Sequence, residues 1–307
     1  MLLIGKNVDM APRAEATAAV VVTYHPDAEL DDRLRRVRSQ VAYVVIVDNS
    51  ATPTVSARLR QLTRENVELI ENDRNVGVAA ALNRGLRRAA ALNLAWVLML
   101  DQDSVVDDDM LASLIHIYHE CPSRDRIGLI GANSRSPISG RVGMACGTRG
   151  REYVETKTTI TSGSLVALSI YERVGPFRDD FFIEGVDLEY CLRLRRHGFA
   201  VLCSRRPLMT HAGGTAEERS LFGRAVLIAN HEPWRYYYML RNFVDIVRHY
   251  AGREPLWVAA ALVNFLKTFV KIWLFERNRV AKFAAMGRGI GDGILGSRRT
   301  CGAKMEP

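Results

Sequence analysis

The segment of this chain with the clearest chemical potential is the run Leu-Met-Leu-Asp-Gln-Asp-Ser at residues 98–104. An apolar stretch at 96–100 has the composition of a buried strand, and it ends in two carboxylates, Asp101 and Asp103. Alternate residues of a strand point to the same side, so both carboxylates can converge on one divalent cation or on a sugar-phosphate. A solvated acidic turn at the end of a strand is the plainer alternative.

The elements that position these acids alternate through the first 130 residues. Apolar strands are expected at 18–23, 43–47, 67–70 and 95–100, with helices at about 27–39, 76–91 and 108–119, the last capped by Asp107. Short strands separated by helices predict an α/β fold with a mostly parallel, doubly wound sheet. Beyond Gly131 we expect shorter strands and turns, a helix at about 187–197 and a strand at 199–203.

Polar clusters follow each of the first four predicted strands, at 23–25, 48–50, 72–75 and 101–103. The carboxyl ends of parallel strands meet at one edge of a sheet, which is where such folds bind ligands. Neither a GxGxxG nor a GxxxxGK[ST] motif follows the first strand, so side chains and carboxylates would have to hold a nucleotide there.

Composition limits the class of protein further. The 307 residues are 48% hydrophobic and 25% charged, which is typical of a globular chain. A formal charge of +8 suits contact with the phosphates of a nucleotide, a nucleic acid or a lipid headgroup. Five scattered cysteines without CxxC spacing favour reduced thiols in the cytoplasm. Residues 1–17 have no uninterrupted apolar core, so we expect a flexible extension rather than a secretory signal.

Six short motifs follow one another along the chain. They are Val-Asp-Asn-Ser at 47–50, Asn-Val-Gly at 75–77, Leu-Asp-Gln-Asp-Ser at 100–104, Thr-Ser-Gly-Ser at 161–164, Gly-Val-Asp-Leu-Glu-Tyr at 185–190 and His-Ala-Gly-Gly at 211–214. Together they resemble the family 2 glycosyltransferases of GT-A fold. With Trp-Arg-Tyr-Tyr-Tyr-Met-Leu-Arg-Asn at 234–242, they resemble its bacterial rhamnosyltransferase branch, which builds O-antigen, other polysaccharides and rhamnolipid. The resemblance covers roughly residues 18–250.

The resemblance implies a donor site at the sheet edge. The residues that would bind the nucleotide and donor are Thr23, Asp48, Asn75, Gly77, Asn83 and Asp101, with Asp48 accepting a hydrogen bond from the pyrimidine. Asp103 and His211 would ligate a divalent cation, Mg²⁺ or Mn²⁺. From the residues alone, Asp48 also fits an Asx turn, and a histidine in a glycine-rich loop is commonly structural.

The resemblance also implies an inverting transfer with Asp187 as the general base that takes the proton of the acceptor hydroxyl. Glu184 and Glu189 are the other acids nearby, and Asp187 also fits a helix N-terminus stabilised by the dipole. Ser162 and Gly163 would lie beneath the sugar and acceptor, although a strand end explains them equally. Trp234 and Arg241 are further acceptor-site candidates, and such an aromatic cluster is otherwise typical of a core.

The C-terminal part is predicted to be helical and separate, giving the division 1–17, 18–230 and 231–307. A helix from Pro255 to about Glu276 is almost wholly apolar, with Asn264, Lys267 and Lys271 on one stripe. We expect it to lie in the membrane interface, because two central lysines make spanning costly. A dimer contact or packing on the catalytic domain predicts the same stripe. After Gly287 we expect a flexible tail.

The leading hypothesis is therefore an enzyme that transfers L-rhamnose from dTDP-L-rhamnose to a lipid-linked saccharide or glycolipid at the inner face of the cell membrane. The alternatives are another nucleotide sugar, a nucleotidyltransferase, or a non-enzymatic basic protein that binds a membrane or a nucleic acid. Acids at the ligand edge would repel a polyanion, so no nucleic-acid partner is expected.

Overall fold

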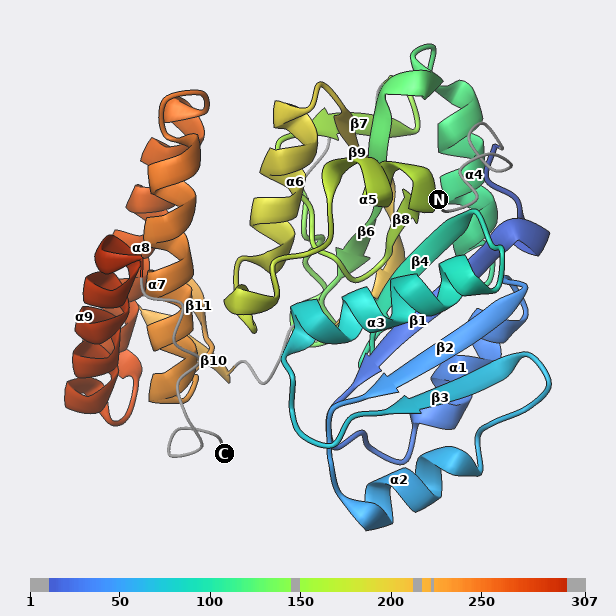
Figure 1. The fold of residues 1–307 in the computed structure, drawn as a ribbon. Helices are drawn as coiled ribbons and strands as arrows, with labels where there is room; N and C mark the ends of the chain where they lie inside the picture. The colour runs from blue at the N-terminus through green and yellow to red at the C-terminus, as the bar shows by residue number, and fades with distance from the viewer. Residues whose placement is uncertain (1–10, 145–149, 212–216, 222–223, 297–307) are drawn as a thin grey trace. The chain divides into compact units, whose positions relative to one another are not determined.

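The computed structural model describes residues 11–144, 150–211, 217–221 and 224–296 (Figure 1). The chain divides into two compact units. The first contains Met1–Arg178 and Tyr190–Ala212, and the second contains Asp179–Glu189 and Gly213–Pro307. The second unit thus includes a short segment that precedes the C-terminal helices by some distance in the sequence.

The first unit is built on the predicted parallel strands. They are β1 (Thr17–Thr23), β2 (Tyr43–Asp48), β3 (Val67–Glu71) and β4 (Trp96–Asp101), paired in the order β3-β2-β1-β4. Thr23 lies opposite Asp48, and Val22 lies opposite Asp101. This register confirms that the polar clusters at the strand ends share one edge of the sheet.

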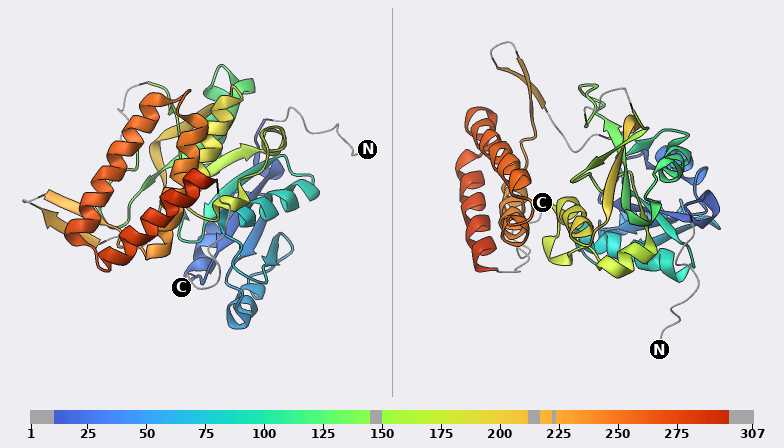
Figure 2. Two further views of the ribbon diagram at one scale, coloured as in Figure 1. Left: turned by 60° about the vertical axis from the view of Figure 1, so that its left-hand side comes forward. Right: turned by 90° about the horizontal axis from the view of Figure 1, so that it is seen from above.

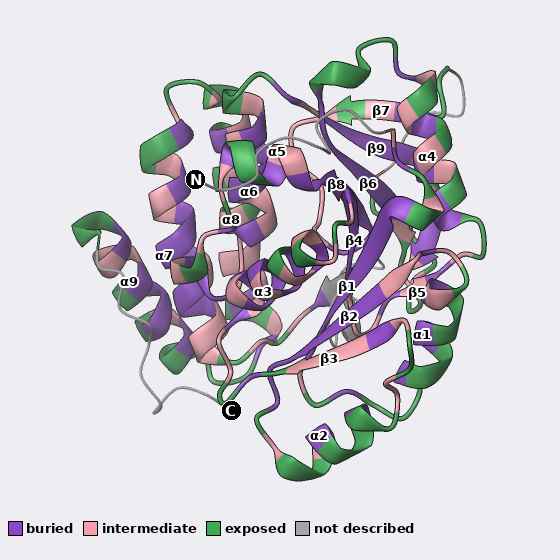
Figure 3. Cartoon of the chain, turned by 45° about the vertical axis from the view of Figure 1, so that its right-hand side comes forward, coloured by how far each residue is buried: buried purple, intermediate pink, exposed green. Residues whose placement is uncertain are grey.

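Helices cover both faces of these strands: α1 (Leu30–Arg38), α2 (Pro53–Arg60), α3 (Val78–Ala91) and α4 (Met110–Glu120). Ala19 and Val21 belong to the same core cluster as the apolar residues of α1 and α4. The opposite face receives α3, where a Cβ atom on Gly85 would lie 2.3 Å from Val20 Cγ1. Figure 3 shows β1 and β4 buried between these layers.

Two predicted helix starts were wrong. The helix after the first strand begins at Leu30 rather than near residue 27, because Asp27 accepts hydrogen bonds from Arg33 and from the amide of Glu29. The predicted cap at Asp107 is also wrong, since α4 begins at Met110. Asp107 instead donates its amide to the carbonyl of Leu208, 2.9 Å away.

The other half of the sheet is mixed. It adds β5 (Val105–Val106), β6 (Ile127–Arg135), β7 (Tyr153–Thr156), β8 (Ser164–Ala167) and β9 (Ala200–Thr210), with α5 (Leu168–Val174) after β8 and α6 (Val186–Arg196) before β9. β8 runs antiparallel to both β4 and β6. β9 was predicted to end at Cys203, but pairing with β6 on one side and with β7 and β5 on the other extends it to Thr210.

The described part of the second unit contains α7 (Pro233–Tyr250), α8 (Pro255–Phe275), α9 (Arg279–Leu295) and a hairpin of β10 (Glu217–Leu221) and β11 (Arg224–Ile228) (Figure 2). The predicted flexible tail after Gly287 was wrong as far as Leu295. Gly289 and Gly293 allow α9 to pack directly on α7, since a Cβ on Gly289 would lie 2.4 Å from the carbonyl oxygen of Tyr237.

Candidate functional site

Three predicted residues form one cluster at the carboxyl edge of the sheet. Asp101 ends β4, Asp103 lies in the following turn, and His211 directly follows β9. One ligand atom from each residue can be chosen so that all three lie within 4.8 Å of one another. His211 Nδ1 is 3.2 Å from Asp103 Oδ1, and its Nε2 is 3.8 Å from Asp101 Oδ2. Two carboxylates and an imidazole at this spacing fit a divalent cation such as Mn²⁺.

The hydroxyl groups of Ser104 and Ser162 contact two residues of this cluster. Ser104 Oγ lies 3.1 Å from His211 Nδ1 and 2.7 Å from Ser162 Oγ. The amide of Asp101 donates to Ser162 Oγ at 3.0 Å. Both serines are almost completely buried, so these hydrogen bonds are shielded from solvent and can orient the ligand side chains. Ser104 was not predicted as a site residue.

The three titratable groups influence one another strongly. Burial raises the pKa of Asp101 to about 6; the charge of His211 opposes this shift, and that of Asp103 adds to it. Burial alone would raise the pKa of Asp103, but the hydrogen bond and charge of His211, with smaller contributions from a backbone amide and Arg33, together outweigh burial and lower it. Burial would lower the pKa of His211, yet the two carboxylates outweigh it and raise that pKa above its usual 6.5.

These shifts predict that protons and a cation compete for the site. Below about pH 6 a protonated Asp101 and a protonated His211 cannot act as ligands, so cation affinity should rise with pH as both groups lose their protons. Each displaced proton contributes up to about tenfold per pH unit. Titration of the free protein with Mn²⁺ at several pH values measures this slope, and an affinity that does not vary with pH would contradict it.

The predicted base-binding residues lie beside this cluster on the neighbouring strands. Asp48 is 1% exposed, and its Oδ1 accepts hydrogen bonds from Thr23 Oγ1 at 2.8 Å and from Ser50 Oγ at 2.6 Å. Ser50 in turn accepts the amide of His25. Because these bonds all use Oδ1, the carboxylate keeps a fixed orientation with Oδ2 as its second acceptor. This geometry supports base recognition and agrees equally with the Asx alternative.

Asn75 and Gly77 shape the entry to α3. The amide of Gly77 donates to Asn75 Oδ1 at 3.0 Å, and its carbonyl accepts from Asn49 Nδ2 at 3.2 Å. Gly77 has a φ of 83°, which favours glycine at this position. These hydrogen bonds stabilise the turn that precedes α3, and the contact of both residues with a ligand stays a prediction.

Asn83 is buried deeper than its predicted nucleotide role requires. Its side chain donates to the carbonyl of Phe177 at 2.8 Å and accepts from Tyr171 Oη at 2.8 Å and from the amide of Phe177 at 3.0 Å. These contacts join α3 to α5 and the segment after it, which is a structural role. A contact between Asn83 and the nucleotide stays a prediction.

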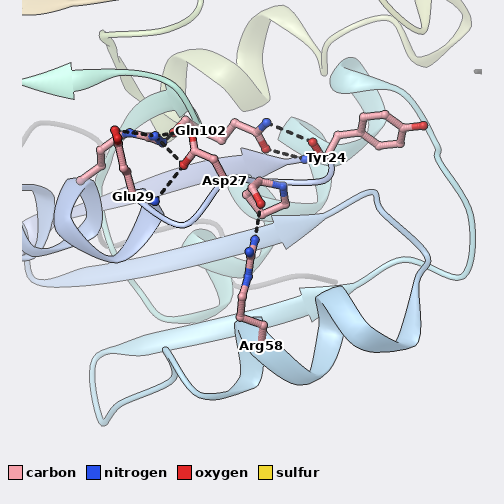
Figure 4. Close-up of polar contacts among 7 residues, drawn as sticks. Tyr24, Asp27, Glu29, Arg58 and Gln102 are labelled. Atoms are coloured by element: carbon pink, nitrogen blue, oxygen red, sulfur yellow. Dashed lines mark hydrogen bonds and ion pairs between the residues drawn. The ribbon is translucent and has the colours of Figure 1, made fainter.

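Gln102, between the two acids, has a role that the sequence did not indicate. Its Oε1 accepts the amide of Tyr24 at 2.7 Å, and its Nε2 donates to the carbonyl of Tyr24 at 3.0 Å (Figure 4). Its own carbonyl accepts from Arg33 at 2.8 Å, and Arg33 is also paired with Asp27 at 2.6 Å. The loop after β1 is thereby clamped to the turn that carries Asp101 and Asp103.

We expect Gln102→Ala to weaken cation-dependent binding of dTDP by up to about 30-fold, because two hydrogen bonds worth about 1 kcal/mol each are lost from the clamp. Calorimetric titration with dTDP and Mn²⁺ measures the effect. Gln61→Ala, the same change at an exposed residue just past α2, should leave binding unaltered. Equal affinities for both variants would show that the clamp is not needed for positioning.

Gly163 has a backbone reason for its identity. It has a φ of 79°, and a Cβ atom there would lie 2.7 Å from the sulfur of Met209 and 3.0 Å from the Cβ of Ala132. Its amide donates to the carbonyl of Met99 at 2.8 Å. Gly163 and Ser162 thus form the floor beside β4, and their predicted contact with the sugar or acceptor stays a prediction.

The predicted base belongs to the second unit, in the first turn of α6. Asp187 Oδ1 accepts the amide of Leu188 at 2.8 Å, and the side chain is half-buried. Glu184 pairs with Arg235, whose Nε lies 2.8 Å away, and Glu189 is buried and accepts Tyr250 Oη at 2.9 Å. Both neighbouring acids therefore have structural partners, and the role of Asp187 as the base stays a prediction.

Arg241 and Asn242 hold the segment that leads into α6. Asn242 Nδ2 donates to the carbonyls of Phe181, Ile183 and Glu184 at 2.7–2.9 Å. Arg241 is 4% exposed; it bonds Asn242 Oδ1 at 2.9 Å and the carbonyl of Asp180. Trp234 packs on the aromatic cluster around Tyr238, so it also has core contacts. Direct contact of Arg241 or Trp234 with an acceptor stays a prediction.

The segment 180–185, which Arg241 and Asn242 contact, has an unusual backbone. Phe182 and Glu184 have positive φ angles of 60° and 59°, followed by Gly185 at 73°. Such conformations persist in side-chain-bearing residues only where surrounding contacts enforce them, and they are concentrated at functional sites. The hydrogen bonds from Asn242 to the carbonyls of Phe181, Ile183 and Glu184 provide that enforcement three to six residues before Asp187.

Comparison with known proteins agrees with this geometry. A family model described as glycosyl transferase family 2 matches residues 18–161. The chain is 30% identical over 240 residues to the dTDP-rhamnosyl transferase RfbF of Shigella flexneri. This alignment covers 75% of this chain and 79% of that protein. It is 24% identical over 196 residues to the low-salt glycan biosynthesis hexosyltransferase Agl10 of Haloferax volcanii, covering 59% and 62% of the two chains.

Two solved structures share the fold. The mannosyltransferase PcManGT of Pyrobaculum calidifontis, in complex with GDP-Man and Mn²⁺, aligns with a TM-score of 0.56 at 17% identity over 94% of this chain and 90% of that one. GalNAc-T7 with UDP, GalNAc and Mn²⁺ aligns with a TM-score of 0.56 at 15% identity, over 76% of this chain and about half, 48%, of that one. Because the family model and the rhamnosyl transferase both match its sequence, this chain is a glycosyltransferase that belongs to family 2.

Proposed function

We propose that the enzyme transfers L-rhamnose from dTDP-L-rhamnose, with inversion, to a hydroxyl group of a lipid-linked saccharide or glycolipid. The observation that carries the proposed donor is the 30% identity to a dTDP-rhamnosyl transferase along three quarters of the chain. The bonded pair Thr23–Asp48 at the sheet edge supports it, because a carboxylate of fixed orientation can accept the imide hydrogen of a thymine base.

We further propose that Asp103, His211 and Asp101 hold Mn²⁺ or Mg²⁺ together with the donor diphosphate. The three donor atoms within 4.8 Å fit such an ion, and the imidazole favours Mn²⁺. A bound cation would neutralise charge on the departing nucleoside diphosphate. Ser104 and Ser162 keep the ligands oriented, and the Gln102 clamp keeps the loop after β1 beside them.

In this proposal Asp187 accepts the proton of the acceptor hydroxyl as that oxygen attacks the anomeric carbon. An inverting displacement occurs in one step, so a single carboxylate at the acceptor is sufficient. Asp187 is supported by its half-buried position in the first turn of α6. A lipid-linked acceptor places the enzyme in the cytoplasm at the inner face of the membrane.

A donor panel tests the proposal. The purified chain with Mn²⁺ is incubated with dTDP-rhamnose, dTDP-glucose, UDP-glucose or GDP-mannose, and the released nucleoside diphosphate is quantified. We expect turnover of dTDP-rhamnose that EDTA abolishes. Preferential turnover of another donor would refute the assigned sugar. In a separate incubation with a nucleoside triphosphate and a sugar phosphate, release of pyrophosphate would indicate nucleotidyl transfer instead.

A further inference from the structure

Helix α8 has two apolar faces, of which one packs within the second unit. Phe265, Phe269 and Ile272 lie in the cluster formed with α7 and α9, and the rings of Phe265 and Phe243 are 4.2 Å apart. Ile272 is fully buried there. Among the described residues, one helix, α8, is long and apolar enough to cross a membrane by length and composition.

The other face of α8 is uncovered within its unit. Of the twelve exposed large hydrophobic residues in the described chain, seven belong to α8 and three to α9. Those of α8 are Leu256, Leu262, Val263, Leu266, Val270, Trp273 and Leu274. On a helix of 3.6 residues per turn they fall in one sector roughly 120° wide that runs the length of α8. We call these seven residues the outer face.

The surroundings of the outer face are positively charged. Lys267 and Lys271 border the sector on one side, and Arg277 and Arg279 are exposed just beyond its end. The acids of this region are engaged: Glu276 is buried with Lys282 at 2.7 Å, and Asp292 accepts Tyr237 Oη at 2.7 Å. The exposed charged residues between 255 and 296 are therefore all basic.

We propose that the outer face of α8 docks on an anionic lipid bilayer, with the helix axis in the plane of the interface. The inference deepens the proposed function, since it rests on a membrane-borne acceptor. An apolar sector bordered by lysines is the pattern of helices that lie in the headgroup region. A span across the bilayer would bury Lys267 near its middle and Lys271 within its C-terminal half. A contact between two copies through this face would bring like charges together, whereas anionic headgroups complement them.

Vesicle flotation of the full chain tests this surface. We expect binding to vesicles of phosphatidylcholine with phosphatidylglycerol and little binding to phosphatidylcholine alone. The double variant Leu266→Ser/Val270→Ser should bind at least about tenfold less, because two apolar side chains leave the buried area. Lys267→Gln/Lys271→Gln should lose the preference for phosphatidylglycerol. Ile138→Ser/Val142→Ser, at the two exposed hydrophobics outside these helices, is the matched control and should bind like the wild type.

Fluorescence gives a second measurement at the proposed face. Trp273 is 63% exposed, so its emission should shift to shorter wavelength on anionic vesicles, and Trp273→Phe should remove that shift. Absence of wild-type binding to anionic vesicles would overturn the proposal. So would resistance to alkaline extraction, which indicates a spanning helix, or a dimer in solution that Leu266→Ser/Val270→Ser dissociates while vesicle binding persists.

Donor turnover separates this inference from the proposed function. Hydrolysis of dTDP-rhamnose in detergent solution should be the same in Leu266→Ser/Val270→Ser as in the wild type, because these residues lie outside the candidate site. Vesicle binding without turnover of dTDP-rhamnose would refute the donor assignment and leave the docking surface standing. Turnover without vesicle binding would do the reverse.

Discussion

Asp103→Ala and His211→Ala should each lower the rate of sugar transfer by about 10²–10³-fold, a typical cost of losing one group that stabilises developing charge. Both variants should also abolish the dependence of dTDP binding on Mn²⁺. The reason is geometric, because these side chains supply two of the three ligand atoms that gather within 4.8 Å. Removal of either leaves too few protein ligands to retain the cation beside the diphosphate.

Titration calorimetry with dTDP, with and without Mn²⁺, measures this effect separately from chemistry. Asp125→Ala and His116→Ala remove the same side chains from exposed positions in the segment 124–126 and on α4, and they should bind as the wild type does. A thermal unfolding curve for each variant establishes that it is folded. Mn²⁺-dependent dTDP binding that survives in both site variants would refute the assigned cation ligands.

The sheet edge could be predicted because its determinants are local. Each strand from β1 to β4 has a short apolar run followed at once by polar residues, and parallel pairing then brings the run ends together. The bond between Thr23 and Asp48 follows directly from their opposed register. The sequence pattern is sufficient to predict such an edge when the paired strands belong to one regular alternation of strands and helices.

The contact between Asp103 and His211 could not be predicted in this way. It depends on β9 reaching Thr210, which requires pairing with three other strands and register shifts that no local pattern indicates. Only the resemblance placed His211 at the site. The Gln102 clamp escaped prediction for the same reason, since its partner, the backbone of Tyr24, is 78 residues away.

Glycines misled the prediction for α9. Alternate glycines from Gly287 to Gly293 have low helix propensity and are typical of a flexible tail. Gly289 and Gly293, four residues apart, instead lie on the side that touches the backbone of α7, where any side chain would clash. Packing against α7 therefore outweighs the low helix propensity of these glycines. Whether they favour or disfavour a helix cannot be predicted without knowledge of the partner helix.

Asp187→Asn should lower the rate of transfer by about 10³-fold while leaving dTDP affinity in the presence of Mn²⁺ within about threefold of the wild type. The amide has the shape of the carboxylate but cannot accept the proton, and general-base catalysis contributes about 10²–10⁴-fold. Asp187 takes no part in the cluster of Asp101, Asp103 and His211, so donor binding should persist.

Glu189→Gln distinguishes the base from its neighbour in α6. Glu189 is buried and accepts Tyr250 Oη at 2.9 Å, so this variant should unfold at a lower temperature and retain most of its turnover. An equal loss of dTDP affinity in Asp103→Ala and Asp187→Asn would instead mean that Asp187 serves donor binding, because a residue confined to the acceptor cannot affect the nucleotide complex.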